Sequence, residues 1–95
     1  MEEGLRLYKN TPGAILLDVR SPGEYKLGRI AGSVNFPIQQ LPTIGEMIED
    51  KEKPIFVYCL SGARSNRAAA FLKKIGYVNV TNIGGLKDYQ GPLEK

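Results

Sequence analysis

The chain has 95 residues, of which 42% are hydrophobic and 24% charged, and its formal net charge at pH 7 is +3. This length allows one small domain with a single core, and the composition is that of an ordinary soluble globular protein. The thirteen basic residues form no run of the kind that binds nucleic acid, so we expect no nucleic-acid partner. No apolar run approaches the ~20 residues of a membrane span, and the first residues do not resemble a signal peptide.

The chain contains one cysteine, Cys59, and no histidine. A single cysteine excludes an internal disulfide, and we expect a cytoplasmic protein whose thiol stays reduced. The absence of histidine excludes Cys–His catalysis and histidine-ligated zinc, and one thiolate cannot build a metal site by itself. We therefore expect the protein to use neither a metal nor a cofactor.

The first half of the chain predicts a short helix over residues 1–9, a buried strand over 14–17, and a second short helix over 22–27. A turn at 10–13 separates the first two elements. Ser21 and Glu24 have the spacing of a capping box, with Pro22 at the first helical position. A brief strand over 33–36 and a helix over 38–49 follow, and we expect Pro42 in the first turn of that helix.

The second half begins with a buried strand over residues 55–58, which leads through a short loop into an amphipathic helix over 64–75. Gly76 stands where a C′ glycine ends a helix. We then expect a strand over 78–81, a tight loop at Gly84 and Gly85, and a helical turn over 86–89. The ordered chain is expected to end at 91–92.

Strands that alternate with helices in this way predict an α/β domain with a parallel sheet covered on both faces. Ligands bind such sheets beyond the carboxyl ends of the strands. Three segments leave strands at that edge: the loop after Cys59, residues 18–20, and the glycine pair at 84–85. The sequence therefore predicts a functional site where these segments meet.

The stretch most suited to chemistry is residues 59–65, whose members are Cys59, Leu60, Ser61, Gly62, Ala63, Arg64 and Ser65. The thiol of Cys59 is expected to face loop amides and the positive end of the following helix, a setting that binds anions and favours thiolate. A free thiol has a pKa of about 8.5, and such settings lower it to about 3.5–7.5. We interpret Cys59 as an activated nucleophile and the six residues after it as a substrate-binding loop.

Simpler interpretations exist for each of these residues. Most free cysteines are buried core residues. Arg64 opposes the helix dipole, so we expect it to bind an anion, whereas Arg67 is expected to be a surface residue. We expect Asp18 to have a structural role, pairing with a neighbouring arginine or a loop amide. Ser65 and Ser61 either face a bound sulfur or satisfy loop backbone.

Several segments together resemble the rhodanese-like (sulfurtransferase) domain family. They are residues 17–25, 28–37, 54–59 with its loop, 76–80, and the glycine pair at 84–85. The resemblance implies one small three-layer α/β domain over residues 1–95, with a sheet of four or five strands and a cysteine that carries sulfur as a persulfide. The chain departs from the family pattern at Arg29, where histidine is usual, and at its short N-terminal region. The acidic residue that is usual before Gly84 is also absent, either because Ile83 replaces it or because one residue is deleted.

The resemblance implies a sulfurtransferase that moves a sulfane sulfur from thiosulfate, a polysulfide or a persulfide to cyanide or a thiol. The partners expected are small sulfur-containing anions or persulfides and a thiol protein acceptor. One alternative is a phosphatase or arsenate reductase, but those of this fold resemble Cys-x5-Arg, whereas Cys59 and Arg64 are spaced Cys-x4-Arg. A second alternative is a non-catalytic interaction module, although such modules often lack the cysteine.

Overall fold

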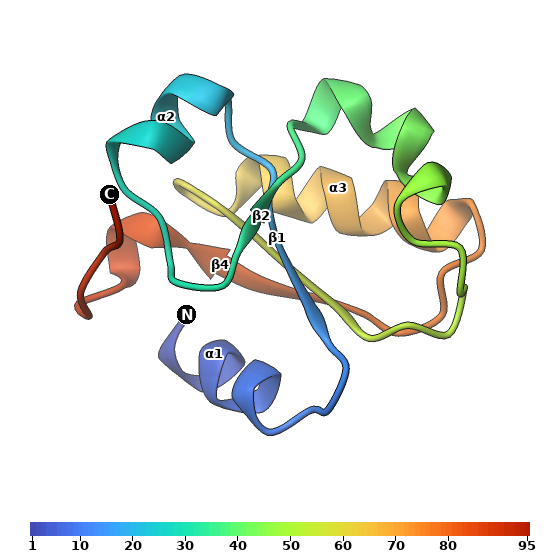
Figure 1. The fold of residues 1–95 in the computed structure, drawn as a ribbon, viewed down its shortest axis with the longest axis horizontal. Coiled ribbons are helices and arrows are strands. Elements are labelled where there is room, and N and C mark those ends of the chain that lie inside the picture. The colour runs from blue at the N-terminus through green and yellow to red at the C-terminus, as the bar shows by residue number, and fades with distance from the viewer.

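Four parallel strands form one sheet in the order β2-β1-β3-β4 in the computed structural model, which describes all 95 residues (Figure 1). The strands are β1 (Ile15–Asp18), β2 (Val34–Asn35), β3 (Ile55–Cys59) and β4 (Val80–Gly85). The α-helices are α1 (Glu2–Lys9), α2 (Pro22–Leu27) and α3 (Ala63–Lys74), and the 3-10 helices are η1 (Ile38–Glu46) and η2 (Leu86–Asp88). The predicted parallel α/β architecture is confirmed.

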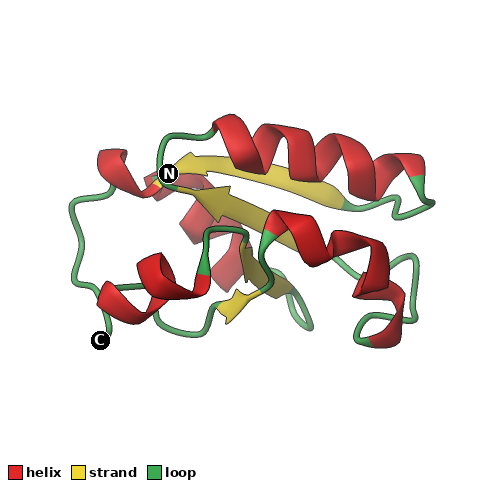
Figure 2. Ribbon diagram, turned by 90° about the horizontal axis from the view of Figure 1, so that it is seen from above, coloured by secondary structure: helices red, strands yellow, loops and turns green.

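Helices cover both faces of the sheet, because successive residues of a buried strand point to opposite faces. Leu17 and Val57 belong to a core cluster with η1 and α3, whereas Leu16 and Phe56 belong to a second cluster with α1. Figure 1 shows α1 on one side of the sheet and η1 and α3 on the other, and Figure 2 shows α3 running alongside the strands. The domain therefore has three layers.

The predicted first helix, the capping box at Ser21 and the helix over 22–27 are confirmed, and so is the central strand with its following helix. The segment after residue 37 differs, because it forms the 3-10 helix η1, with Pro42 in its interior. Proline lacks an N–H group and interrupts the hydrogen bonds of an α-helix, and short 3-10 segments are a common result. The expectation that Pro42 lies in a first turn was wrong.

The last strand also differs from its prediction. β4 covers Val80–Gly85, so it includes the two glycines that were expected to form a loop, and Val78 lies outside it with 68% of its surface exposed. The pairing of β3 with β4 shifts register between Val57 and Cys59, and Gly84 has φ of +101°. Glycine in a strand often marks such an irregularity.

The C-terminal residues are also more ordered than expected, since Arg29 and Glu94 exchange two backbone hydrogen bonds in an antiparallel bridge. Because all four strands are parallel, β1, β3 and β4 end at the same edge of the sheet, close to η2 and to this bridge. None of the helices has the length and apolar content that a bilayer span requires.

Candidate functional site

Cys59 is the last residue of β3, and its thiol lies under the loop that leads to α3. The amide of Gly62 donates a hydrogen bond to Sγ over 2.9 Å, and the Ser65 hydroxyl lies 3.4 Å from the same sulfur. The side chain is completely covered, with 0% exposure, and it packs in the core cluster beneath α3. Cys59 thus combines the burial of a core cysteine with polar partners that such a cysteine normally lacks.

These partners set the acidity of the thiol. Burial raises the pKa of Cys59, but hydrogen bonds from the Ser65 hydroxyl and from the amides of Ser65, Gly62 and Ser61 outweigh this effect and lower the pKa below its usual value. Hydrogen bonds that favour the charged form act in this direction. The loop therefore stabilises a thiolate inside a covered site.

Two glycines give the loop its shape. Gly62 has φ of +98°, a left-handed conformation that favours glycine, and it directs its amide to the sulfur. Gly85 lies under the loop, because a Cβ atom there would stand 2.5 Å from the carbonyl oxygen of Leu60. The same carbonyl accepts a hydrogen bond from the amide of Lys87 over 3.0 Å. The end of β4 therefore supports the loop.

The residues predicted to bind substrate occupy different positions around the sulfur. Leu60, Ser61 and Ala63 are exposed, Gly62 and Arg64 are half-buried, and Ser65 is fully buried. The Gly62 amide and the Ser65 hydroxyl contact Sγ in addition to the amides of Ser61 and Ser65, and the hydroxyl of Ser65 also donates to the carbonyl oxygen of Gly62 over 3.1 Å.

Arg64 directs its guanidinium to Glu24, a residue to which the sequence assigned only a capping role. Two parallel hydrogen bonds of 2.7 and 2.9 Å join the groups, and each side chain is 30% exposed. The Arg64 hydrogen bond lowers the pKa of Glu24 to about 2. Arg67 is exposed, as expected.

A second ion pair lies deeper at the same edge. Arg20 donates hydrogen bonds of 2.9 and 2.6 Å to the two carboxylate oxygens of Asp18, and it reaches the carbonyl oxygen of Gly28 over 2.7 Å. Asp18 is 0% exposed and Arg20 4% exposed. The predicted structural role of Asp18, pairing with a neighbouring arginine, agrees with this geometry.

The family model for the rhodanese-like domain matches residues 2–91. The chain belongs to this family. It is 36% identical over 80 residues to the thiosulfate sulfurtransferase PspE of Escherichia coli, a match that covers 83% of this chain and 77% of that protein. A structure described as rhodanese with anions from E. coli has a TM-score of 0.79 and 35% identity, and the match covers 86% of this chain and 98% of that one.

Other relatives of this rhodanese-like domain are larger proteins. The tRNA uridine(34) hydroxylase of Erwinia tasmaniensis is 37% identical over 84 residues, which cover 82% of this chain. The chain spans only 24% of the length of that hydroxylase.

Two of the departures from the family pattern, those at Arg29 and Ile83, are accommodated in the structure. The guanidinium of Arg29 lies 4.8 Å from the centre of the Tyr25 ring and 3.5 Å from the Glu94 carboxylate. Ile83 is 5% exposed and belongs to the core cluster on the α1 face, where α1 approaches it at Gly4. An apolar residue therefore fits the position at which the family usually has an acidic one.

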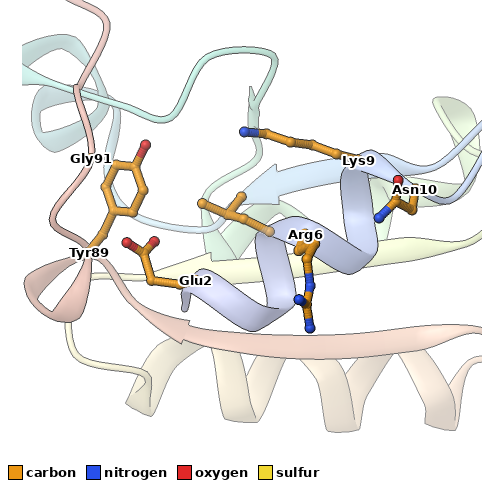
Figure 3. A pocket seen from close by; sticks show the side chains of 7 residues that line it. Glu2, Arg6, Lys9, Asn10, Tyr89 and Gly91 are labelled. Atoms are coloured by element: carbon orange, nitrogen blue, oxygen red, sulfur yellow. The ribbon is translucent and has the colours of Figure 1, made fainter.

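Two surface hollows lie near these elements. The first, which we call the rim hollow, has a volume of about 250 Å³ and borders the cysteine loop at Leu60. Its other lining residues are Arg20, Glu24, Leu27, Gly28, Leu86 and Leu93. The second, of about 430 Å³, lies between α1 and the C-terminal segment, where Tyr89 faces the side chains of α1 (Figure 3). No residue of the cysteine loop lines this second hollow.

The rhodanese-like domain has no cluster of three or more potential metal ligands.

Proposed function

We propose that the protein is a sulfurtransferase that carries a sulfane sulfur as a persulfide on Cys59. The observation that carries the proposal is the set of hydrogen bonds on Sγ, because a buried thiol with a lowered pKa and converging amides is suited to hold a negative sulfur. The similarity to a protein named thiosulfate sulfurtransferase supports this assignment.

The reaction proceeds in two displacements. In the first, the Cys59 thiolate attacks the outer sulfur of thiosulfate, a polysulfide or a persulfide, and sulfite or a thiolate leaves with the electron pair of the broken S–S bond. In the second, cyanide or an acceptor thiolate attacks the terminal sulfur, and the Cys59 thiolate is released. No external oxidant is needed, because each step exchanges one bond to sulfur for another. The reduced thiol that this cycle requires persists in a reducing compartment such as the cytoplasm.

The complete burial of Cys59 adds one requirement to this cycle. A donor cannot reach a sulfur that is 0% exposed, so the loop residues that cover it must move before the first displacement. Leu60, Ser61 and Ala63 belong to this loop and are exposed, so they can move with the smallest loss of packing contacts. The sulfur is then reached from the side of the loop that faces solvent.

The geometry favours sulfur transfer over the alternatives of a phosphatase and an arsenate reductase, both of which bind a tetrahedral oxyanion. An oxyanion of that kind needs a free arginine, but the guanidinium of Arg64 already donates two hydrogen bonds to the carboxylate of Glu24. The Cys-x4-Arg loop is also one residue shorter than the Cys-x5-Arg loops expected of phosphatases with this fold.

The test is the intact mass of the protein after incubation with thiosulfate or glutathione persulfide. We expect the mass of one added sulfur atom, removable by cyanide with release of thiocyanate, and we expect Cys59→Ser to form no adduct. Because the chain has no other cysteine, a serine variant that still produced thiocyanate at the wild-type rate would overturn the mechanism.

A second measurement addresses the activation of the thiol. Ser65→Ala removes a hydroxyl that lies 3.4 Å from Sγ, so the pKa of Cys59 should rise and the pH profile of iodoacetamide alkylation should move upward. Ser61→Ala is the matched control, because the Ser61 side chain is exposed and only its amide acts on the sulfur. Equal profiles for the two variants would assign the activation to the amides alone.

A further inference from the structure

Each charged side chain at the rim hollow forms an ion pair with a residue of opposite charge. Of the residues that line it, Arg20 and Glu24 are charged, and each is bound to a partner of opposite sign. Asp18 neutralises Arg20 in the interior, and Glu24 takes both parallel hydrogen bonds of the Arg64 guanidinium. The side chains that line the rim hollow therefore include no positive charge without a negative partner.

The rest of the rim hollow is apolar. Leu27 is 79% exposed, Leu60 45% and Leu93 41%, and Leu86, at 9% exposure, lies beneath them. Solvent-exposed leucines that gather on one hollow indicate binding of an apolar group. A volume of about 250 Å³ is sufficient for a short aliphatic chain.

From these two observations we propose that the rim hollow selects persulfides of small apolar thiols over the thiosulfate dianion, and that Glu24 determines this preference. This inference rests on the proposed function and names the donor class for the same site. In the first displacement, the Cys59 thiolate forms a bond to the outer sulfur of R–S–SH. The S–S bond of the donor breaks and R–S⁻ leaves with its electron pair, while the alkyl group R lies on the leucines and the proton stays on the transferred sulfur as Cys59–S–SH.

Glu24 acts here as a specificity-determining residue. Its carboxylate accepts the hydrogen bonds of Arg64, which is the only arginine of the cysteine loop, and neutralises its charge. Thiosulfate carries two negative charges, and a free guanidinium at this place would attract it. A persulfide carries at most one charge when it is ionised, and it reacts with the Cys59 thiolate as neutral R–S–SH. Pairing Arg64 with Glu24 therefore weakens thiosulfate binding more than persulfide binding.

The experiment measures one ratio, which is kcat/KM for thiosulfate divided by kcat/KM for propyl persulfide. In Glu24→Gln the ratio should rise by about tenfold, the size expected for a partly screened interaction of one charge with a dianion. Glutamine is tolerated at this capping-box position, so the fold should be retained. The thiosulfate rate of this variant should also fall with added salt, whereas that of the wild type should change little.

A double variant separates this role from a direct role of Arg64. If the pair acts as one neutral unit, Arg64→Gln should lower the ratio and Glu24→Gln/Arg64→Gln should restore the wild-type ratio. If Arg64 attracts the donor despite its partner, the double variant should keep the low ratio of Arg64→Gln, and the proposal is overturned.

The leucines are tested with methyl, propyl and pentyl persulfides. Wild-type kcat/KM should increase with chain length, by up to about fourfold for each methylene that is buried. Leu27→Ser and Leu93→Ser should flatten this increase. Leu7→Ser is the matched control, since Leu7 is 49% exposed on α1 and does not line the rim hollow. Rates independent of chain length would overturn the apolar part of the inference.

The proposed function and this inference fail in different ways. If no donor adds sulfur to Cys59, both are overturned. If thiosulfate and persulfides both add sulfur but the ratio does not respond to Glu24→Gln, the sulfurtransferase assignment stands and the selectivity assignment falls.

Discussion

Two ion pairs at the same edge of the sheet differ in nearly every property. Asp18 and Arg20 are two residues apart and almost completely buried, and their hydrogen bonds extend to the carbonyl oxygen of Gly28. Glu24 and Arg64 are 40 residues apart, join α2 to α3, and remain 30% exposed. The first pair is part of the interior that supports the edge, whereas the second borders the hollow through which a donor would approach.

The difference indicates separate tasks. A charge inside the protein requires a partner at all times, because an unpaired buried charge is strongly unfavourable. A charge at the surface can gain or lose its partner at little cost in stability, so the same pairing there mainly controls what the site attracts. Substitutions should therefore affect stability at the first pair and donor preference at the second.

The largest effect is expected from Asp18→Asn, which leaves the Arg20 charge buried without its partner. Breaking a buried pair in this way costs about 3–5 kcal/mol of unfolding free energy. Urea unfolding followed by circular dichroism measures this. Asp18→Asn combined with Arg20→Met should lose less than Asp18→Asn alone. A loss below about 1 kcal/mol in the single variant would show that water reaches this pair.

An intermediate effect is expected from Gly85→Ala, which alters the support beneath the cysteine loop. The new Cβ would stand 2.5 Å from the Leu60 carbonyl oxygen, so the loop backbone must shift, and overpacking of this kind costs about 1–3 kcal/mol. The displaced amides should also raise the pKa of Cys59. Gly45→Ala is the control, because nothing lies within 4 Å of a Cβ there. Equal stability of the two variants would contradict the close approach.

The smallest effect on stability is expected from Glu24→Gln, at about 0.2–1 kcal/mol near neutral pH. The pKa of Glu24 is lowered from 4.5 to about 2 in the folded protein, so its ionised form stabilises the fold. This contribution is fully present above about pH 4.5 and is lost as the pH falls towards 2. Unfolding free energies of the wild type and the variant should therefore converge over this range. A difference that stayed constant would show that the charge of Glu24 is not its cause.

Local patterns in the sequence were sufficient for most of the fold. The apolar run before Cys59 predicts the central strand, and the capping box at Ser21 predicts α2 with its observed bounds. Predictions failed where tertiary contacts determine the secondary structure. Pro42 is tolerated inside a 3-10 helix, and the glycine at 85 extends a strand because it must lie against the loop.

In the candidate site, too, local features were predicted and contacts between distant segments were not. Cys59, the loop glycine and the start of the helix are consecutive in the chain. The sequence therefore predicted correctly that amides of this loop lie near the sulfur. The pairing of Glu24 with Arg64 connects distant segments and was missed. The signals for it were present: an arginine at a helix start needs a negative partner, and the carboxylate of Glu24 has more capacity than one cap requires.

The all-parallel sheet also determines how the site comes into being during folding. Parallel neighbours cannot be joined by a hairpin, so every strand of this sheet pairs with a segment distant in sequence. Such topologies fold more slowly than helical bundles, because loops must close before the pairings are gained. The contacts of Gly62 and Ser65 with the thiol are local, but the loop that holds them rests on Gly85, which reaches Cys59 only after α3 has carried the chain back and β4 has paired with β3. A nascent or refolding chain therefore carries an ordinary thiol, and the reactive one arises together with the completed sheet.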